Sequence, residues 1–554
     1  MAWWGVVLLL IATSISVAVA TVTLTTSGLT ATVSNGDVTV VFNAHARVSS
    51  VKIDDVNIVS TTENSFYLDW NENGEVSFSP SSLTVVNDTD SLAHFYWLQD
   101  GASDQFEIEL HYLMVEGISG VYSWAKFINS QSANVSLGEA RTVYRFNADL
   151  LTQGTNQARS GTLYLYSYLN TQTKVQDETW ELADGTYYTK YDYAGYLRNT
   201  TYQGVYGSGY GAFLISPSRE YHAGGPLKQD LLIHQDSLIT NYFVSSHFGT
   251  SGLTAPSGWT HIYGPWLLYF NTGTNSAILS DVATQAETEK DSWPYSFVND
   301  DDYPVDRGTV KGTITGQPLA TIMLYDTEET SYDDQQLGYV FTTESDSSGS
   351  YTLKNVRPGT YNVVAYPVAG QGSENEAKTT VTVAAGETVT VSSLDLPEPD
   401  DIIWNIGETN RRSSEFKYSA ELRNYLYETL PPETLTFTIG TSTDADDWYY
   451  AQSQAGIWTI EYDDAKDGNT RTLRVALAAA SQSPHLIVSV NSHKVGDVYY
   501  GNDQAVYRSA MQSGTFHSNV FTVTNAQVVN GTNTITLQVS KGKVMYDAIS
   551  LQRG

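Results

Sequence analysis

The fold of this chain is predicted best by the stretch Leu29-Thr30-Ala31-Thr32-Val33-Ser34-Asn35-Gly36-Asp37-Val38-Thr39-Val40-Val41-Phe42. Two runs rich in β-branched residues flank Asn35-Gly36, and Asn-Gly between such runs is the strongest short-range signal for a β-hairpin. Similar runs recur at spacings of roughly ten residues, with Gly, Asn, Asp and Ser between them. The best helical candidate is a short stretch at Ala283–Trp293. The pattern therefore predicts an all-β protein of sandwiches or barrels.

Charge is strongly unbalanced along the chain. The 554 residues include 61 Asp and Glu against 29 Lys and Arg, which gives a formal net charge of −32. Such a surface disfavours nucleic acid and anionic membranes as partners. An acidic substrate would have to be bound by a local basic cluster, so each Lys, Arg and His is informative. The chain has no cysteine, which excludes disulfides and thiolate metal sites.

The first twenty residues predict a cleaved secretion signal. The apolar run from Trp3 to about Ile15 is too short to span a bilayer, and Ala18-Val19-Ala20 matches an A-x-A cleavage pattern. We therefore expect the mature chain to be secreted, extracellular and soluble, and to be a monomer. Asn-x-Ser/Thr sequons that would permit N-glycosylation in a eukaryotic host occur at Asn87, Asn134, Asn199 and Asn530.

Two breaks divide the mature chain into three β-rich domains, at 21–300, 305–397 and 402–554. The acidic run Asn299-Asp300-Asp301-Asp302 interrupts the strand pattern, and Pro397-Glu398-Pro399-Asp400-Asp401 is a linker stiffened by proline. The middle segment alternates apolar and polar residues around a turn at Pro358-Gly359. It resembles the fibronectin type III-like domains of secreted carbohydrate enzymes, and we interpret it as a spacer without chemistry.

Five tyrosines surround one lysine in Tyr187-Tyr188-Thr189-Lys190-Tyr191-Asp192-Tyr193-Ala194-Gly195-Tyr196. Aromatic faces stack on sugar rings. A lysine that is partly desolvated or crowded by cations has a lowered pKa and can act as a base. If the segment is a strand, Asp192 shares a face with Lys190 and its charge opposes that shift. The alternative is an exposed strand with an ordinary solvated lysine.

Further segments between 137 and 270 carry basic and aromatic residues. Arg141 and Arg145 lie four apart on a strand-like run and hence on one face. The segment 241–250 contains Tyr242 and His247, and the aromatic segment 261–270 follows it. A Walker loop, a His-Glu-x-x-His helix and a Gly-x-Ser-x-Gly elbow are all absent from the sequence.

In this order, these segments resemble the rhamnogalacturonan lyases, family four of the polysaccharide lyases. The third domain adds further matching segments at 406–408, 411–416, 447–452 and 507–514. The resemblance covers essentially the whole mature chain. It implies a large N-terminal β-sandwich (a supersandwich), a fibronectin type III-like domain and a C-terminal jelly-roll domain like those that bind carbohydrate.

The resemblance also implies an activity on pectin. Family members cut the rhamnose-(1→4)-galacturonate bond of rhamnogalacturonan I by β-elimination and leave a 4,5-unsaturated uronate end. Lys190 matches the family's general base. His247 matches its essential histidine, which would protonate the leaving oxygen or stabilise the enolate. The matched substrate contacts are Arg141 near the uronate carboxylate, Tyr242 in the site and Arg508 from the third domain.

No cofactor is expected for catalysis, because an arginine paired bidentately with the uronate carboxylate would replace the calcium of many pectic lyases. A structural calcium in the third domain stays open. Thr240 stands where some family members have another tyrosine.

Two other functions stay open from the residues alone. One is a non-catalytic pectin-binding protein with the same fold. The other is a glycoside hydrolase with two carboxylates, a geometry that is invisible in sequence. By itself, His247 could be a structural histidine and Arg145 an ion-pair partner. The aromatic residues 448–450 could belong to a core.

Overall fold

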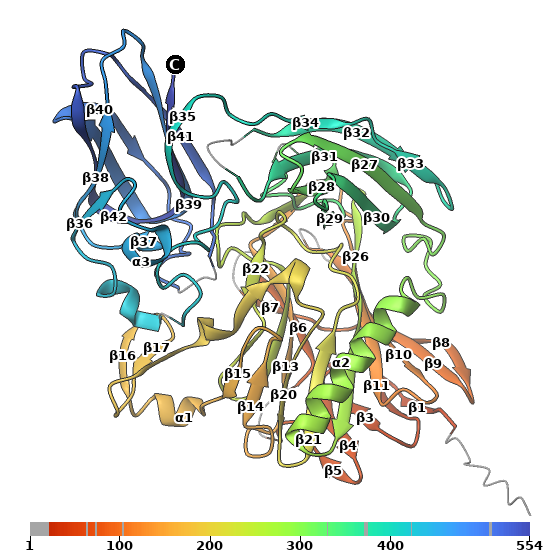
Figure 1. Ribbon diagram of the computed structural model, residues 1–554. Coiled ribbons are helices and arrows are strands. Elements are labelled where there is room, and N and C mark those ends of the chain that lie inside the picture. Colours follow the sequence, from red (N-terminus) through yellow and green to blue (C-terminus); the bar gives the residue numbers. More distant parts are fainter. Residues whose placement is uncertain are drawn as a thin grey trace, which may run out of the picture.

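The computed structural model describes residues 21–61, 65–71, 75–101, 105–329, 331–370, 375–422, 424–508 and 512–554. The predicted secretion signal, residues 1–20, lies outside the described residues. Strands dominate the described chain, so the all-β prediction is confirmed (Figure 1). None of its helices combines the length and the apolar character needed to cross a membrane.

The first sheet contains the predicted hairpin. Its strands are β1 (Thr23–Ser27), β2 (Thr30–Ser34), β3 (Thr39–Phe42), β4 (Val48–Ile53) and β5 (Val56–Asn57), in that order. The Asn35 side chain closes the turn between β2 and β3, because its Oδ1 accepts the backbone N–H of Val38 at 3.1 Å. Its Nδ2 also donates to the carbonyls of Val115 and Ile118. One side chain thus shapes the hairpin and ties it to the neighbouring sheet.

Two larger sheets form the sandwich of the N-terminal domain. One has the order β15-β14-β20-β21-β26-β11-β10-β9-β8 and the other β23-β24-β13-β6-β7. Phe243 of β24 stacks on Tyr263 of β26 with ring centroids 4.7 Å apart, within one core shared by both sheets. The strands are β6 (Tyr67–Asn71), β7 (Glu75–Ser77), β8 (Ser82–Thr89), β9 (Leu92–Gln99), β10 (Glu107–Val115), β11 (Gly120–Ile128), β13 (Glu139–Arg145), β14 (Gln153–Thr155), β15 (Ser160–Thr162), β20 (Tyr202–Gly207), β21 (Tyr210–Ile215), β23 (Ile233–His234), β24 (Leu238–Val244) and β26 (Thr260–Thr272).

Helix α2 (Asn275–Ser292) covers the other face of the nine-stranded sheet (Figure 1). Its buried residues Ile278, Val282 and Ala286 pack in a second apolar cluster with side chains of β20, β21 and β26. Thr274 caps the helix by accepting the backbone N–H of Ala277. The predicted helix at 283–293 is therefore only its second half. The first turn contains Asn and Ser, which have modest helix propensity.

Short elements surround the future site. A small sheet joins β16 (Thr173–Gln176), β17 (Thr179–Glu181) and β18 (Tyr187–Thr189), and β19 (Ala194–Tyr196) pairs with β22 (Gln229–Leu231). The remaining elements of this domain are β12 (Val135–Leu137), which pairs with β25 (Leu253–Ala255), the helical turn α1 (Tyr166–Leu169) and the 3₁₀ turns η1 (Lys190–Tyr193) and η2 (Leu197–Asn199).

The second domain is a small two-sheet sandwich. One sheet contains β30 (Ser350–Val356), β27 (Gly308–Gly316), β33 (Thr388–Thr390) and β34 (Leu394–Leu396), and the other β29 (Phe341–Glu344), β28 (Ala320–Asp326), β31 (Gly359–Pro367) and β32 (Ala377–Val383). The predicted turn at Pro358-Gly359 joins β30 to β31, which lie in different sheets. The alternation on its two sides therefore faces one core from opposite layers.

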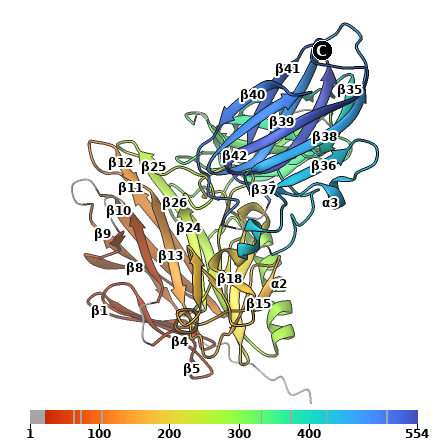
Figure 2. The ribbon, with the colours of Figure 1, turned by 90° about the vertical axis from the view of Figure 1, so that its left-hand side faces the viewer.

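The third domain is built around two very long strands, β39 (Arg471–Val490) and β42 (Gly531–Arg553). They pair antiparallel with several register shifts, where the strands change direction. The domain lies over β16–β18 of the first domain (Figures 1 and 2). Its other elements are β35 (Ile402–Gly407), η3 (Asn424–Glu428), β36 (Thr434–Thr438), α3 (Asp444–Asp447), β37 (Ala451–Gln452), β38 (Gly456–Asp464), β40 (His493–Tyr499) and β41 (His517–Val523).

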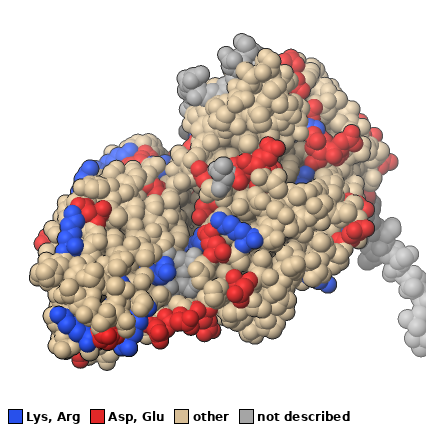
Figure 3. All heavy atoms as spheres, turned by 90° about the horizontal axis from the view of Figure 1, so that it is seen from above, with Lys and Arg blue, Asp and Glu red and all other residues tan. Residues whose placement is uncertain are grey.

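Two aromatic residues of the third domain are buried in its core, whereas many charged residues lie on the surface of the protein. Trp448 and Tyr450 are fully buried, so these two belong to the core of the third domain, as the alternative interpretation held. On the face shown in Figure 3, acidic side chains are widely spread, and Lys and Arg form small separate groups. This agrees with the strong acidic excess of the sequence.

A buried carboxylate links the first two domains. Glu220 accepts from Nη1 of Arg307 at 2.5 Å and from Nε of Arg357 at 2.7 Å, and the three side chains are at most 5% exposed. Removing one partner of a buried ionic group leaves uncompensated charge inside the protein.

We expect Glu220→Gln to lower the free energy of unfolding by about 3–5 kcal/mol, because two buried guanidinium groups lose their counter-charge. Denaturant unfolding followed by tryptophan fluorescence measures it. Glu287→Gln is the control, since Glu287 is 71% exposed and pairs with Lys290 on the surface; it should cost less than about 0.5 kcal/mol. Identical unfolding curves for Glu220→Gln and wild type would contradict the role of this ion pair.

Candidate active site

Lys190 begins a 3₁₀ turn, so the prediction of a continuous strand here is wrong. Two short strands, Tyr187–Thr189 and Ala194–Tyr196, stand on either side of the turn η1, and Thr189 caps that turn by accepting the backbone N–H of Tyr191 at 3.3 Å. The turn removes Asp192 from the face of Lys190. Asp192 is buried instead, and burial raises its pKa to about 7. Asp192 therefore does not raise the pKa of Lys190 as expected; Asp177 and Glu178 have that effect instead.

The surroundings of Lys190 favour an uncharged amine. Burial lowers the pKa of Lys190; Asp177 and Glu178 oppose this shift, and the charge of Arg508 adds to it. The Nζ atom lies 5.2 Å from the ring centroid of Tyr191. Within the described part of the chain, Lys190 takes part in no ion pair of 4.0 Å or less. This differs from the ordinary solvated lysine of the alternative interpretation.

The tyrosines around Lys190 are mostly buried and do not form an open aromatic shelf. Four of the five are at most 7% exposed: Tyr188, Tyr191, Tyr193 and Tyr196. Tyr187 is only partly buried and packs against Tyr425 of the third domain, with ring centroids 5.5 Å apart. Of these rings, Tyr191 lies nearest to Lys190 in the contacts described, and burial of the amine is the largest cause of its lowered pKa.

His247 follows β24 and is held through one ring nitrogen. Its Nδ1 lies 2.6 Å from Oγ of Ser245, and its ring meets Tyr242 edge to face at 5.0 Å. Burial lowers the pKa of His247 well below its usual value, and the charges of Lys190 and Arg508 act in the same direction. The imidazole is therefore neutral at neutral pH.

Arg141 is already engaged by carboxylates of the protein. Its Nε and Nη2 donate to the two oxygens of Asp69, at 2.8 and 3.2 Å, and Asp69 is buried. Its Nη1 donates to Tyr242 Oη at 2.9 Å and lies 3.1 Å from Glu139. Asp69 thus occupies the Nε–Nη2 side of the guanidinium, which could otherwise bind the carboxylate of a uronate through two hydrogen bonds. A substrate carboxylate can reach Arg141 only along the Nη1–Nη2 side.

Arg508 of the third domain lies against first-domain residues next to Lys190 and His247. Its Nη1 donates to the backbone carbonyl of His247 at 3.0 Å, and its guanidinium lies over the ring of Tyr191 at 5.2 Å. Nη2 is 3.4 Å from Asp177, whose oxygen also accepts from Tyr191 Oη at 2.6 Å. A second bridge runs from Gln176 Nε2 to the carbonyl oxygen of the neighbouring Tyr507, at 2.7 Å. The candidate site, which we call the cleft, therefore lies where the first and third domains meet.

The structure brings together the five predicted residues: Lys190, His247, Arg141, Tyr242 and Arg508. Arg145 lies on the same face of β13 as Arg141 and donates to Tyr67 Oη at 3.0 Å. The residues that sequence reasoning missed are carboxylates and their partners: Asp69, Glu139, Asp177, Asp230 and Ser245. Of these, only Glu139 and Ser245 could have been found from the sequence, because each stands two positions before a predicted site residue, Arg141 or His247. The others come from different strands.

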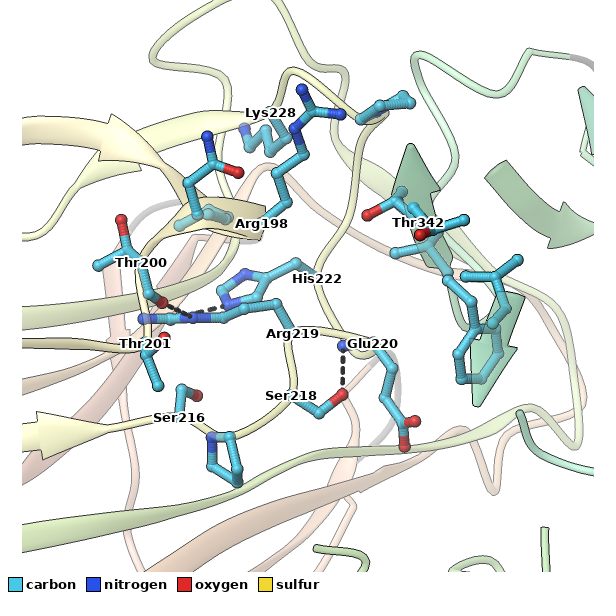
Figure 4. A pocket seen from close by; sticks show the side chains of 18 of the residues that line it. Arg198, Thr200, Thr201, Ser216, Ser218, Arg219, Glu220, His222, Lys228 and Thr342 are labelled. Atoms are coloured by element: carbon cyan, nitrogen blue, oxygen red, sulfur yellow. Dashed lines mark hydrogen bonds between the residues drawn. The ribbon is translucent and has the colours of Figure 1, made fainter. Parts of the chain in front are cut away.

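A polar cavity of about 410 Å³ lies apart from these residues, between the first and second domains (Figure 4). Its wall includes Arg219, His222 and Lys228 from the first domain and Thr342 from the second. Arg219 donates to the carbonyl of Thr200 at 3.2 Å and contacts His222 at 3.2 Å. None of the five predicted residues lines this cavity, so we assign it no part in the reaction.

Metal ligands do not gather in the described residues, where no three His, Asp or Glu side chains stand together as a metal site would require. The four sequon asparagines are all exposed, and Asn87 lies on β8 at the edge of the nine-stranded sheet.

Comparison with known proteins identifies the family. The model "Rhamnogalacturonan lyase B, N-terminal" matches residues 84–287, and domains II and III of polysaccharide lyase family 4 match 306–391 and 402–551. A rhamnogalacturonate lyase of Dickeya dadantii is 39% identical and covers 99% of this chain and 98% of its own length. The chain belongs to the rhamnogalacturonan lyases of polysaccharide lyase family 4. Rhamnogalacturonate lyase B of Emericella nidulans is 25% identical over 60% of this chain and 54% of its own length.

The family resemblance drawn from the sequence is thereby confirmed, and the chain is a polysaccharide lyase. This sets aside the glycoside hydrolase and the non-catalytic binding protein. The predicted arrangement of a fibronectin type III-like and a carbohydrate-binding-like domain behind the sandwich is confirmed by the same matches.

We expect Arg508→Gln to shift the rising limb of the pH profile of kcat/KM to higher pH. Arg508 lowers the pKa of Lys190, so its removal raises that pKa, and the neutral amine forms only at higher pH. A shift on the order of half a unit to one unit is expected. The control is Arg553→Gln, since Arg553 is 52% exposed near the end of the third domain. An unshifted limb in Arg508→Gln would show that Arg508 does not act on the base.

Proposed function

We propose that this lyase is a secreted endolyase that cuts rhamnose-(1→4)-galacturonate bonds in the rhamnogalacturonan I backbone of pectin. The observation that carries the proposal is Lys190, a partly buried amine that has no ion-pair partner among the described residues and lies near His247, Arg141 and Arg508. Endo action and the identity of the bond rest on the family resemblance. The grouping of Lys190, Arg141 and Arg508 gives a polyanionic substrate a local set of cations in a chain with a strong acidic excess.

The proposed reaction is a β-elimination. Neutral Nζ of Lys190 takes the proton from C5 of galacturonate, and the electron pair of that bond forms the C4=C5 double bond. The bond from C4 to the rhamnosyl oxygen breaks, and this oxygen leaves with the bonding pair and takes up a proton. Lys190 is left as an ammonium and returns its proton to solvent. The product is a 4,5-unsaturated uronate on one side and a rhamnose end on the other.

Removal of the C5 proton requires that charge on the uronate be neutralised, because the developing carbanion lies next to the carboxylate. Arg508 and the free side of Arg141 supply guanidinium groups for this purpose. The hydroxyl oxygen of Tyr242 accepts a hydrogen bond from Arg141. Its O–H can therefore donate a hydrogen bond to a substrate oxygen or to Glu139. The protein thus carries cations for a role that calcium has in many pectic lyases.

Secretion and glycosylation complete the proposal. The pattern in residues 1–20 supports export, and the exposure of Asn87, Asn134, Asn199 and Asn530 supports glycan attachment in a eukaryotic host. We expect the mature enzyme to act as a monomer on plant cell-wall pectin.

Lys190→Ala is expected to lower kcat at least about 10²-fold without unfolding the protein, because the base is lost. Lys190→Arg should not restore turnover, since arginine holds its proton. The ultraviolet absorbance of the conjugated uronate measures both, alongside thermal melts. Lys378→Ala, at a lysine that is 56% exposed in the second domain, is the matched control. Near-wild-type turnover of Lys190→Arg would show that the residue only binds charge.

Chelation gives a second test. Because guanidinium groups neutralise the uronate in the proposed reaction, activity on rhamnogalacturonan should persist within about twofold in excess chelator. Homogalacturonan, which lacks the rhamnose–galacturonate bond, should give no absorbance change. If chelator abolishes turnover while the melting temperature is unchanged, and calcium restores it, the guanidinium role is refuted.

A further inference from the structure

A chain of three polar residues lies behind His247 and has no part in the steps above. Lys228 directly precedes β22, Asp230 is the middle residue of that strand, and Ser245 follows β24. Nζ of Lys228 lies 3.5 Å from Asp230, Oγ of Ser245 lies 3.2 Å from the same carboxylate, and Nδ1 of His247 lies 2.6 Å from that hydroxyl. The chain therefore ends on one ring nitrogen of the histidine.

The inner end of the chain is buried and fully hydrogen-bonded. The side chains of Lys228 and Asp230 are 7% and 2% exposed. Nζ of Lys228 donates to the carbonyl of Ser245 at 2.7 Å and to Thr250 Oγ1 at 2.9 Å, and its third direction faces Asp230. Oδ1 of Asp230 accepts the N–H of Leu231 at 2.9 Å and faces Ser245. Buried ionic groups persist only with such partners.

This arrangement fixes the direction of the hydrogen bonds. The Oδ1 atom of Asp230 is an acceptor, so the single hydroxyl proton of Ser245 is donated to it. The conclusion is the same whether the proton shared by the buried pair lies on Nζ of Lys228 or on Oδ2 of Asp230. Oγ of Ser245 is left with its lone pairs. These accept the backbone N–H of His247 at 3.2 Å and, at 2.6 Å, the ring Nδ1. Nδ1 must then carry the proton.

We propose that Lys228, Asp230 and Ser245 are positioning residues that hold His247 as its Nδ1–H tautomer, so that Nε2 presents an electron pair to the cleft. The proposal rests on the proposed function and decides between roles that the family resemblance left open. An Nε2 lone pair cannot protonate the leaving oxygen or donate to an enolate. It accepts a hydrogen bond, either from a sugar hydroxyl or from the Lys190 ammonium that forms as C5 loses its proton.

The alternative, a doubly protonated ring, is disfavoured by the same surroundings. Burial and the nearby charges of Lys190, Arg508, Lys228 and Arg141 all oppose the imidazolium. A cleft crowded with cations gains from a neutral acceptor, because the ammonium created in the reaction then has a partner. His247 is thus suited to support the base rather than to act as the acid.

The tautomer can be measured without any turnover. Protein with ¹⁵N-labelled histidine rings is expected to show protonated Nδ1 and unprotonated Nε2 at His247 at neutral pH, with the signals assigned by their loss in His247→Gln. Ser245→Ala should convert His247 toward the Nε2–H form and lower kcat at least about tenfold with KM nearly unchanged, as expected when an imidazole loses the partner that sets its tautomer. Ser245→Thr keeps the hydroxyl and should restore both.

Ser246→Ala is the matched control, because Ser246 is the exposed neighbour. An Nε2–H tautomer in the wild type, or a Ser245→Ala variant with unchanged kcat, would overturn the inference while leaving the lyase reaction intact. Absence of unsaturated product from wild-type enzyme would instead overturn the proposed function, and the tautomer spectrum would still decide the role of Ser245.

Discussion

The cleft depends on how four neighbouring cations are balanced in a protein that has few of them. Arg141 is bound to buried Asp69 and Lys228 to buried Asp230, so both charges are compensated inside the protein. Lys190 lacks such a partner in the described chain, and the nearest carboxylate of Arg508 lies 3.4 Å away. Lys228 is thus a structural cation, Arg141 offers a ligand only the side away from Asp69, and Lys190 and Arg508 are the less compensated pair. This division favours the unprotonated amine of Lys190, which can accept a proton, while guanidinium groups remain to attract a uronate.

The third domain is part of the catalytic unit and not an appendage. Arg508 contacts the carbonyl of His247, and Gln176 of the first domain is held by Tyr507 and Tyr427 of the third. These contacts fix a guanidinium over Tyr191, where its field reaches both Lys190 and His247. A few polar contacts across one interface thus join the carbohydrate-binding-like domain to Lys190 and His247.

The sequence predicted much of this because it has strong local signals. Asn35-Gly36 gave the hairpin, and the order of the Arg141, Lys190 and His247 segments gave the family. Prediction from local sequence patterns was wrong where one side chain altered the backbone conformation, and it missed ion-pair partners that lie far away in the sequence. Thr189 caps a 3₁₀ turn that stands at Lys190 in place of the expected strand. Asp69 takes the edge of Arg141 from another strand of the sheet, a contact that spacing along one segment cannot reveal.

The long strands of the third domain make the site depend on contacts between distant parts of the chain. Arg471 of β39 pairs with Arg553 of β42, so their sheet closes only when segments far apart in sequence meet. Contacts of such high sequence separation form slowly. Arg508 lies between these two strands in the chain, so its contact with His247 depends on a third domain whose sheet has closed. A chain in which that sheet is open therefore lacks one wall of the site, even where Lys190 and His247 are in place.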